Sequence, residues 1–253
     1  MIITFTDFGL SGPYLGQVRA VFAAEAPQVP VIDLFADAPA YDPMAASYLL
    51  AAYAPSLPDG SVFFCVVDPG VGGDRDPIMV AAGGRQFVGP DNGLFEGVLR
   101  QAEHAASTQG ARPPKAWRID WRPERGLSDS FHGRDLFAPV TARLANGMRV
   151  DATPTAPGDL YRPDWPDHLA RVIYIDHYGN AMIGLSQEDL AETDQLDVGG
   201  KLIQHARVFS DTETGHPFWY VNSNGLVEIA VNRGRADEAL GLSVGFDVTI
   251  VKA

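Results

Sequence analysis

The chain contains the segment Val62-Phe63-Phe64-Cys65-Val66-Val67-Asp68-Pro69-Gly70-Val71-Gly72, an unbroken apolar run that ends in an aspartate and a glycine-rich turn. A short apolar run bounded by turn residues is typical of a strand that is buried on both faces. Such strands belong to parallel sheets that are covered by helices. The aspartate directly after the run is therefore expected at the carboxyl edge of a sheet, where α/β proteins bind their ligands.

The alternation of strand-like and helix-like patterns continues on both sides of this segment. We expect further strands at residues 2–5 and 31–35, a hairpin formed by 78–82 and 86–88, and helices at 14–26, 43–53, 93–101 and 135–145. Strands separated by helical segments predict an α/β fold. The expected N-terminal domain is α/β/α, with a mostly parallel sheet and helices on both faces.

The composition changes between residues 150 and 166, where proline, aspartate, threonine and glycine dominate. This composition is typical of a linker. The apolar runs after it are short and separated by turn residues, at 171–175, 181–183, 201–204, 218–221, 226–231 and 246–251, with one short helix at 236–240. They predict a small β-barrel or sandwich. We therefore expect an N-terminal domain at 1–152, a linker at 153–168 and a C-terminal β-barrel domain at 169–253.

The 253-residue chain is acidic, with a formal net charge of −13. An acidic chain repels phosphate backbones, so nucleic acid is not an expected partner, although plain solubility also explains the charge. No apolar run approaches the roughly 20 residues needed to cross a bilayer, so no membrane partner is expected. The start, Met1-Ile2-Ile3-Thr4-Phe5-Thr6-Asp7, lacks the pattern of a signal peptide, and a cytoplasmic protein is expected.

Cysteine and histidine usage gives little sign of a metal. Cys65 is the only cysteine, and its place in an apolar run favours a buried strand residue over a nucleophile. The chain has no His-x-x-x-His pair, and no loop has the carboxylate density of a calcium site. We therefore expect neither a metal nor a cofactor.

A second informative segment, Ser130-Phe131-His132-Gly133-Arg134-Asp135, directly precedes an expected helix. A histidine there, beside a glycine that lets a ligand approach the backbone, is typical of a site. If His132 met Asp68 and Arg75, the three side chains could activate water. The histidine would relay a proton, the aspartate would orient the water or withdraw a proton, and the guanidinium would stabilise hydroxide. The alternative for Asp68 is a tight turn in which it caps its own backbone.

Several short motifs occur in a fixed order along the chain. They are Thr6-Asp7-Phe8-Gly9, Tyr41-Asp42-Pro43, Val67-Asp68-Pro69-Gly70-Val71-Gly72, Gly89-Pro90-Asp91-Asn92-Gly93-Leu94, Phe131-His132-Gly133-Arg134-Asp135-x-Phe137-Ala138-Pro139 and Asp176-x-x-Gly179-Asn180. In this order they resemble the S-adenosyl-L-methionine (SAM) hydroxide adenosyltransferases, relatives of the SAM-dependent fluorinase and chlorinase. The resemblance implies an α/β/α domain, a β-barrel domain and a homotrimer with active sites between subunits. It also implies nucleophilic displacement at the 5′ carbon of SAM, which releases L-methionine.

The same resemblance separates the branches of the family. The halogenases have a tyrosine where Asp68 stands, the fluorinase has a serine where Gly133 stands, and the Asp-Arg-His set matched here by Asp68, Arg75 and His132 is absent from them. The resemblance therefore implies an enzyme that hydrolyses SAM by SN2 displacement, giving adenosine and methionine, with SAM as substrate rather than cofactor. In that reaction Arg75 and His132 would position and stabilise the water, and Asp68 would orient them.

The resemblance also implies substrate-binding residues in the N-terminal part of the chain. Asp7 resembles the carboxylate that holds the ribose hydroxyls, since a carboxylate offers two acceptors to a cis-diol. Tyr41 matches an aromatic residue, a tryptophan in the halogenase, that lines the ribose and sulfonium region, where a cation–π contact is plausible chemistry. Gly133 lies beside His132 and belongs to the same expected site.

Five further residues are carried over in the C-terminal part. Asp176 resembles the carboxylate that meets the methionine ammonium group, and Asn180 resembles the amide that reads the adenine. Ser223, Asn232 and Arg233 fall in the segment that contacts the methionine carboxylate and the adenine edge. The alternatives are structural: Asp176 and Asn180 would only shape a turn, and Asn232 with Arg233 would only end a strand.

Three functions stay open on the sequence alone. The favoured one is a SAM hydrolase that forms adenosine. A halide-using relative is the second, although position 68 is not tyrosine and position 133 is not serine. The third is a protein that binds SAM or adenosine with little turnover.

Overall fold

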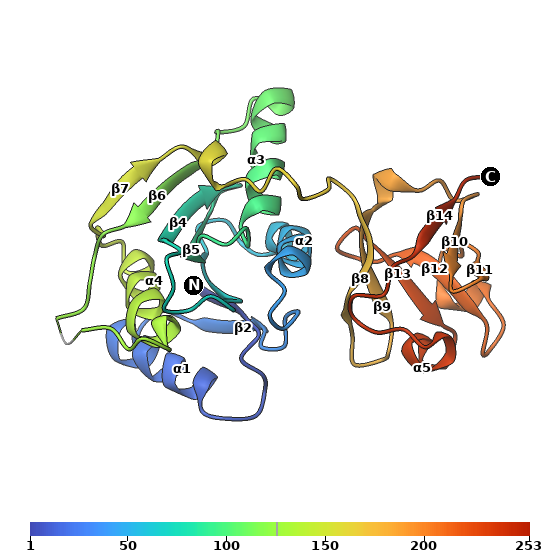
Figure 1. The fold of residues 1–253 in the computed structure, drawn as a ribbon, viewed down its shortest axis with the longest axis horizontal. Coiled ribbons are helices and arrows are strands. Elements are labelled where there is room, and N and C mark those ends of the chain that lie inside the picture. Colours follow the sequence, from blue (N-terminus) through green and yellow to red (C-terminus); the bar gives the residue numbers. More distant parts are fainter. Residues whose placement is uncertain (125) are drawn as a thin grey trace. The chain divides into compact units, whose positions relative to one another are not determined.

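A seven-stranded sheet forms the centre of the first half of the chain, in the order β2-β1-β3-β5-β4-β6-β7 (Figure 1). The computed structural model describes residues 1–124 and 126–253. The sheet strands are β1 (Ile2–Thr6), β2 (Val31–Phe35), β3 (Val62–Val66), β4 (Pro77–Ala82), β5 (Arg85–Pro90), β6 (Lys115–Ile119) and β7 (Ala152–Thr155). The strands β2, β1, β3 and β5 are parallel, and β4, β6 and β7 extend the sheet in antiparallel fashion.

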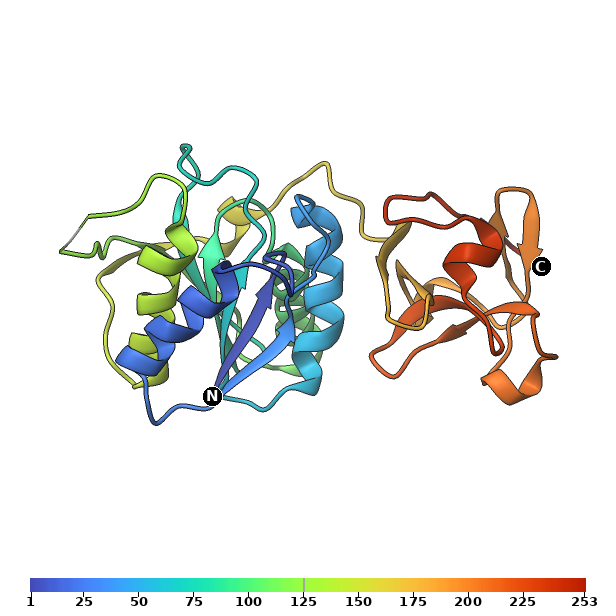
Figure 2. The same cartoon turned by 90° about the horizontal axis from the view of Figure 1, so that it is seen from below.

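Helices cover both faces of this sheet, as the alternating pattern predicts. One face carries α1 (Tyr14–Glu25) and α4 (Ala138–Ala145), and the other carries α2 (Pro43–Tyr53) and α3 (Glu96–Gln109) (Figures 1 and 2). The central strand β3 is buried along its whole length. Shorter helical turns lie at η1 (Ala54–Ser56), η2 (Gly133–Phe137, a π-helix) and η3 (Pro157–Leu160). The expected α/β/α domain is confirmed.

Apolar side chains from strand β3 and from the helices of one face pack together in a buried core. The core between β3, α1 and α4 includes Val18, Phe22, Phe64 and Val140, all fully buried. Cys65 is also fully buried in β3, and burial raises the pKa of its thiol well above the usual value. The interpretation of Cys65 as a strand residue is confirmed.

The second half of the chain is antiparallel. It contains β8 (Leu169–Ile175), β9 (Ala181–Ser186), β10 (Gln195–Val198), β11 (Lys201–Ile203), β12 (Pro217–Val221), β13 (Leu226–Val231), β14 (Thr249–Val251), the helix α5 (Ala236–Leu240) and the turns η4 (Gln187–Asp189) and η5 (Phe209–Asp211). The strands form a four-stranded sheet, β12-β13-β9-β8, and a three-stranded sheet, β11-β10-β14. One core, which includes Val172, Trp219 and Ile229, is shared by both sheets. The expected C-terminal β domain is present as these two sheets.

The division between the two halves differs from the expected linker. The compact units are Met1–Pro163 and Asp164–Ala253. Residues 152–155 form β7, which pairs with β6 and so completes the first sheet. Prolines are tolerated in β7 because it is an edge strand, with only one neighbour to supply with hydrogen bonds. Much of the expected linker at 153–168 therefore belongs to the first unit.

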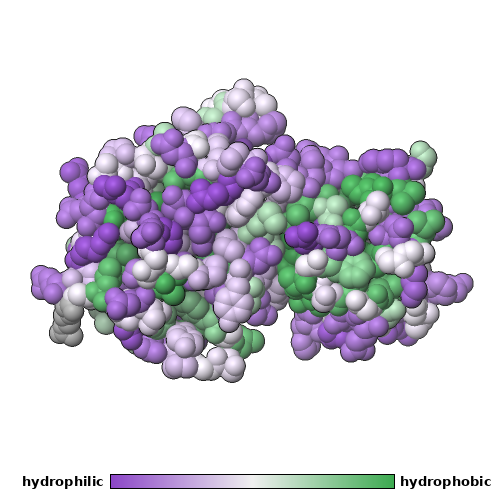
Figure 3. Space-filling model, viewed as in Figure 1, coloured by the Kyte–Doolittle hydropathy of each residue, from purple (hydrophilic) through white to green (hydrophobic). Residues whose placement is uncertain are grey.

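The surface carries both polar and apolar side chains (Figure 3). Large apolar side chains are exposed in each unit, among them Leu10 and Tyr41 in the first and Tyr178 and Leu202 in the second. Among the described residues, no helix is both long and apolar enough to span a membrane.

The start of helix α2 provides a test of local stability. Asp42 accepts a hydrogen bond from the backbone N–H of Ala45 at 3.0 Å, and Pro43 occupies the first helical position. Because the cap satisfies an otherwise unpaired N–H, Asp42→Ala should lower the free energy of unfolding by about 1 kcal/mol. Urea denaturation would measure the loss. Asp42→Ser, which keeps a capping oxygen, should recover most of it, and equal losses in both variants would contradict the capping role.

Candidate active site

The candidate site begins where two neighbouring parallel strands end. Asp7 follows β1, and Asp68 lies two residues beyond β3. The backbone N–H of Asp7 donates to the carbonyl of Val66, so the two strand ends are held side by side. The chain leaves β1 through α1 to β2 on one side and reaches β3 through α2 on the other. This reversal creates a crevice at the carboxyl edge of the sheet, the usual ligand site of such folds.

Three of the predicted residues are in direct contact. The Arg75 Nε donates to both carboxylate oxygens of Asp68, at 3.0 and 3.1 Å, and its Nη2 approaches Oδ2 at 2.5 Å. The same Nη2 lies 2.9 Å from Nδ1 of His132. The side chains of Arg75 and Asp68 are only 10% and 4% exposed. The structure thus brings Asp68, Arg75 and His132 together, with Arg75 at the centre.

The contact with Arg75 fixes the state of the histidine. A guanidinium has only donors, so Nδ1 of His132 must accept, and the neutral ring then carries its proton on Nε2. Burial lowers the pKa of His132, and the charge of Arg75 lowers it further, while Asp68 opposes both effects. His132 is therefore a neutral imidazole near pH 7, with Nε2–H as its available donor.

A glycine permits the close approach of the two loops that carry these residues. Gly72 has φ +80°, and a Cβ at this position would lie 2.3 Å from the backbone oxygen of Asp129. Any other residue would force the 68–75 loop away from the segment that leads into His132. The glycine-rich turn is thus explained by loop-to-loop packing.

A cavity of about 300 Å³ opens beside this cluster. It is lined by Asp7, Phe8, Tyr14, Tyr41, Val66, Asp68, Val71, Ser130, Phe131, His132 and Gly133. All five N-terminal candidates other than Arg75 line it. Arg75 is not part of the lining, but it contacts two residues that are, Asp68 and His132. The volume is at the lower end of the range for small-molecule sites.

Asp7 and Tyr41 are coupled at the rim of the cavity. The backbone N–H of Tyr41 donates to Oδ2 of Asp7 at 3.1 Å. Tyr41 has φ +61°, a conformation rare for a residue with a side chain, and its side chain is exposed. Burial raises the pKa of Asp7, with a smaller contribution from the charge of Asp68. Local strain of this kind is common at functional sites.

Gly133 is constrained by aromatic rings. A Cβ there would meet the Phe8 ring at 3.0 Å and the Phe131 ring at 3.2 Å. The Phe8 and Phe131 centroids are 5.7 Å apart in an edge-to-face arrangement, and Tyr14 lies 5.4 Å from Phe131. These three rings form a wall of the cavity that we did not predict as part of the site. The signal was present, because Phe8 and Phe131 both adjoin predicted residues in the sequence.

The second unit contains its own group of predicted residues. Asp176 accepts from the backbone N–H groups of Tyr178 and Asn180 at 2.9 Å, and from the Asn180 side-chain amide at 3.1 Å. The buried carboxyl of Glu228 lies in the same group, where it accepts from Tyr220 and Asn222. Burial raises the pKa of Glu228, and the nearby Asp176 raises it as well. Glu228 was not predicted, since a glutamate inside an apolar strand has no motif to mark it.

The remaining predicted residues lie at turns of the same unit. Ser223 follows β12, in the turn that leads into β13. The Asn232 side chain donates to the backbone carbonyl of Thr212 at 2.8 Å, which holds a neighbouring loop. Arg233 has φ +57° in the turn after β13. The structure brings Asp176 and Asn180 into contact, whereas the Asn232 side chain binds the Thr212 carbonyl instead.

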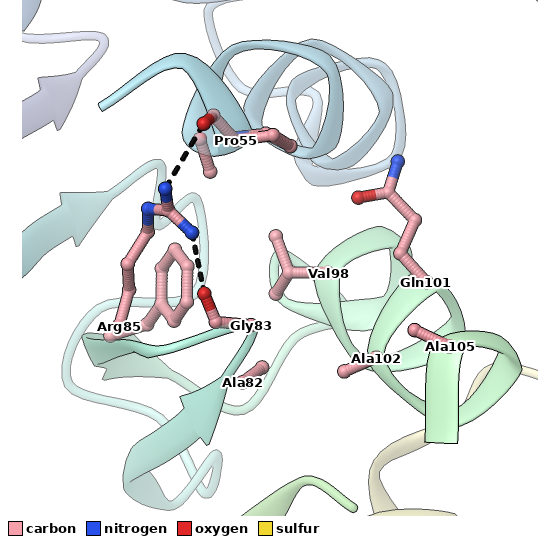
Figure 4. Close-up of a pocket in the computed structure, with 10 residues that line it drawn as sticks. Pro55, Ala82, Gly83, Arg85, Val98, Gln101, Ala102 and Ala105 are labelled. Carbon is pink, nitrogen blue, oxygen red and sulfur yellow. Dashed lines mark hydrogen bonds between the residues drawn. The ribbon is translucent and has the colours of Figure 1, made fainter. Parts of the chain in front are cut away.

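A separate cavity of about 200 Å³ lies between η1, the β4–β5 hairpin and α3 (Figure 4). Its lining is mostly apolar, with Val98, Ala102 and Ala105 on the helix side. The Arg85 guanidinium donates to backbone carbonyls of Pro55 and Gly83 at 3.0 and 2.5 Å, as the dashed lines in Figure 4 show. Arg85 thus braces the hairpin, and this cavity lacks the acid–base cluster of the first.

Metal ligation has no support in the described part of the chain. Within residues 1–124 and 126–253, no group of three or more His, Cys, Asp or Glu side chains is placed to hold an ion.

Known proteins resemble this chain over nearly its whole length. The chain matches the family models for the SAM hydroxide adenosyltransferase N-terminal domain over residues 2–153 and the C-terminal domain over residues 170–249. It is 40% identical to an (R)-S-adenosyl-L-methionine hydrolase of Thermus thermophilus over 97% of both chains. A protein of the same name from Salinispora arenicola is 38% identical over 95% of this chain and 93% of its own. The crystal structure of an uncharacterized conserved protein from Thermotoga maritima has a TM-score of 0.81 and 27% identity, with full coverage of both chains. The chain belongs to the SAM hydroxide adenosyltransferase family.

Proposed function

We propose that this protein hydrolyses SAM, with water attacking the 5′ carbon of the ribose to give adenosine and L-methionine. The observation that carries the proposal is the contact of Arg75 with both Asp68 and His132, beside a cavity that also receives Asp7 and Tyr41. Hydrolases at up to 40% identity over nearly the whole chain support the same reaction.

The reaction makes unequal demands on the protein. The bond between the 5′ carbon and sulfur breaks, and its electron pair neutralises the sulfonium, so the leaving group needs no acid. Water is a weak nucleophile and must be held in line with that bond. As the new carbon–oxygen bond forms, the water loses a proton, which is released to solvent. The protein's task is therefore to position one water and to stabilise its developing negative charge.

The geometry of the cluster divides this task. Asp68 lines the cavity and can accept an O–H of the water, which orients a lone pair of the oxygen. His132 presents Nε2–H, which can donate to the same oxygen as it becomes hydroxide-like. Arg75 contacts both residues, so it acts as a positioning residue: it holds Asp68 by a forked ion pair and His132 in one tautomer. This refines the expectation that Arg75 meets the hydroxide directly.

Substrate contacts in the first unit follow from the lining of the cavity. Asp7 is proposed to hold the ribose hydroxyls with the lone pairs not used by Tyr41. Tyr41 and the ring wall of Phe8 and Phe131 offer π faces to the sulfonium cation. Gly133 keeps the floor of the cavity open, because a side chain there would displace the rings.

Substrate contacts in the second unit are proposed from the family resemblance. Asp176 is proposed to meet the ammonium group of methionine, and Asn180 the adenine. Ser223, Asn232 and Arg233 are proposed to contact the methionine carboxylate and the adenine edge. The hydrogen bond between Asp176 and Asn180 supports a single, ordered binding feature at that turn.

The proposed working form is a homotrimer whose active sites lie between subunits. Exposed apolar side chains in both units, including Leu10 and Leu202, support self-association. SAM is the proposed small-molecule partner, and no metal or organic cofactor takes part. The net charge of −13 supports the proposal that the protein binds neither nucleic acid nor anionic membrane. The cytoplasm is its proposed location.

Liquid chromatography of purified protein incubated with SAM, with and without chloride, tests the function. We expect adenosine and methionine in equal amounts, at a rate that chloride does not change. A 5′-chloro product would assign the protein to the halide-using relatives. Tight SAM binding without product would identify it as a binding protein, and either result would refute the hydrolase.

A further inference from the structure

The motif Gly89-Pro90-Asp91-Asn92-Gly93-Leu94 has no part in the site described above. It follows β5, which runs parallel to β3 with Phe63 opposite Phe87 and Phe64 opposite Val88. The end of β5 therefore lies beside the end of β3, close to the start of the loop that carries Asp68. Asp91 and Asn92 are both partly buried there.

Asn92 holds the first end of that loop. Its side-chain Nδ2 donates to the backbone carbonyl of Val67 at 2.8 Å, one residue before Asp68. Its Oδ1 accepts from the backbone N–H of Leu94 at 3.3 Å, which fixes the orientation of the amide. The carbonyl of Val67 lies one residue past the end of β3.

Asp91 holds the other end of the same loop. Its backbone N–H donates to the carbonyl of Asp76 at 2.8 Å, one residue after Arg75. The Arg162 guanidinium in turn binds Asp91, with Nη2 at 2.6 Å from Oδ1 and 3.0 Å from the backbone oxygen. Two adjacent residues thus clamp both ends of the 68–75 loop, and an ion pair secures the clamp.

Apart from the close approach of Gly72 to Asp129, the middle of the loop is exposed, so its two ends must be held from elsewhere. Residues 69–74 are mostly exposed and rich in glycine, the residue that loses the most conformational freedom on ordering. Inside the loop, the backbone bonds are Val71 N–H to Asp68 and Gly73 N–H to Gly70. Yet Asp68 and Arg75, at its two ends, have buried side chains with a defined forked geometry. The proposed chemistry depends on the arrangement of Asp68 and Arg75 at the two ends of the loop.

We infer that Asn92 is a positioning residue, which holds the end of β3 so that Asp68 and Arg75 keep His132 in its reactive arrangement. It makes its contribution through the Val67 carbonyl and the clamp that it forms with Asp91. The kinetic part of this inference rests on the proposed function. Its structural part does not, since the arrangement around His132 can be measured without substrate.

The test uses the full-length variants Asn92→Ala and Asn92→Asp and follows the His132 ring by 15N NMR as pH is varied. The charged groups around this ring include Arg75 and Arg122, which lower its pKa, and Asp68 and Asp129, which raise it. Asp135, in the helical turn that follows, also interacts with the ring electrostatically. If the loop loosens, the His132 ring becomes more exposed and Arg75 moves away from it. The midpoint of the His132 titration should therefore rise toward the ordinary histidine value in both variants. The size-matched Asn92→Asp keeps the side-chain volume and guards against simple loss of packing.

Kinetics with SAM give the second readout. Each variant should lose about tenfold in kcat, roughly the worth of one hydrogen bond, while KM stays within about twofold. Asn146→Ala is the matched control, because Asn146 Nδ2 also donates to a backbone carbonyl, that of Glu25, at 2.9 Å. It should lower thermal stability but leave both the His132 midpoint and kcat unchanged.

The results distinguish failure of the Asn92 inference from failure of the proposed function. An unchanged His132 midpoint in both folded Asn92 variants would overturn the inference, as would an equal shift in Asn146→Ala. If the wild-type protein releases no adenosine from SAM, the proposed function fails. A shifted midpoint in that case would still support Asn92 as the residue that positions the cluster.

Discussion

Replacing His132 with alanine should lower kcat by about 100- to 1,000-fold, the usual cost of losing a donor to a developing oxyanion. The reason is geometric: Nδ1 accepts from Arg75 at 2.9 Å, so the neutral ring has only Nε2–H to offer the attacking water. SAM should still bind, because Asp7, Tyr41 and the aromatic wall remain. Single-turnover kinetics would measure the chemical step, and calorimetry would measure the affinity.

His132→Gln separates two roles for the same residue. Glutamine supplies an N–H donor near the position of Nε2 but cannot take up a proton at neutral pH. A donor role predicts that His132→Gln keeps substantially more activity than His132→Ala, whereas a general-base role predicts that both are equally slow. His104→Ala is the control, since His104 is an exposed residue of α3 and should turn over at the wild-type rate. A wild-type rate in His132→Ala would refute its place in the reaction.

Much of the first unit was predictable because its signals are local. The apolar run that forms β3 is buried along its length, as continuous apolar patterns in parallel sheets require. Asp7 and Asp68 were expected at the same sheet edge because both follow strands, and the structure places them in one cavity. Strands β6 and β7 were missed, since their residues alternate with charged side chains and prolines at the sheet margin.

The relations within the site depend on contacts that a single sequence does not display. Residues 75 and 132 are 57 positions apart, and only the fold brings the guanidinium to Nδ1 rather than into the cavity. Asn92 binds the backbone carbonyl of Val67, and a contact with the backbone cannot be predicted from the pattern of side chains in the sequence. Glycine at position 72 was correctly taken as a turn residue, but its reason, the approach of Asp129, is a tertiary contact.

The start of helix α4 differs from the start that the sequence pattern predicts. The pattern predicts a helix from residue 135, but the chain forms a π-helix over Gly133–Phe137 before α4 starts at Ala138. Irregular helical turns of this kind often occur at functional sites. Here the π-helix begins immediately after His132, and the backbone N–H of Ala138 donates to the carbonyl of Gly133, five residues earlier.

The protonation of His132 should make hydrolysis sensitive to acid. Burial and the charge of Arg75 hold its pKa below the ordinary 6.5, so the ring stays neutral at pH 7. An imidazolium could not accept from Arg75, and it would face the sulfonium of bound SAM in the same cavity. The neutral form is therefore the active one. Asp7, whose pKa is raised by burial, is the other group of the cavity that could titrate on the acid side.

We expect kcat/KM to be independent of pH above 6.5, with an inflection below 6.5. Below the inflection kcat/KM should fall about tenfold per pH unit, which is about 100-fold at two units below it. Arg75→Gln removes a charge that lowers the pKa, and the inflection should move to higher pH. Arg75→Lys keeps that charge, and the inflection should stay low even though the forked pair with Asp68 is lost. In His132→Gln the acid limb should disappear. An acid limb that persists in His132→Gln would belong to Asp7 and would contradict the assignment of the limb to His132. The assignment would also be contradicted if the inflection had the same pH in Arg75→Gln as in the wild type.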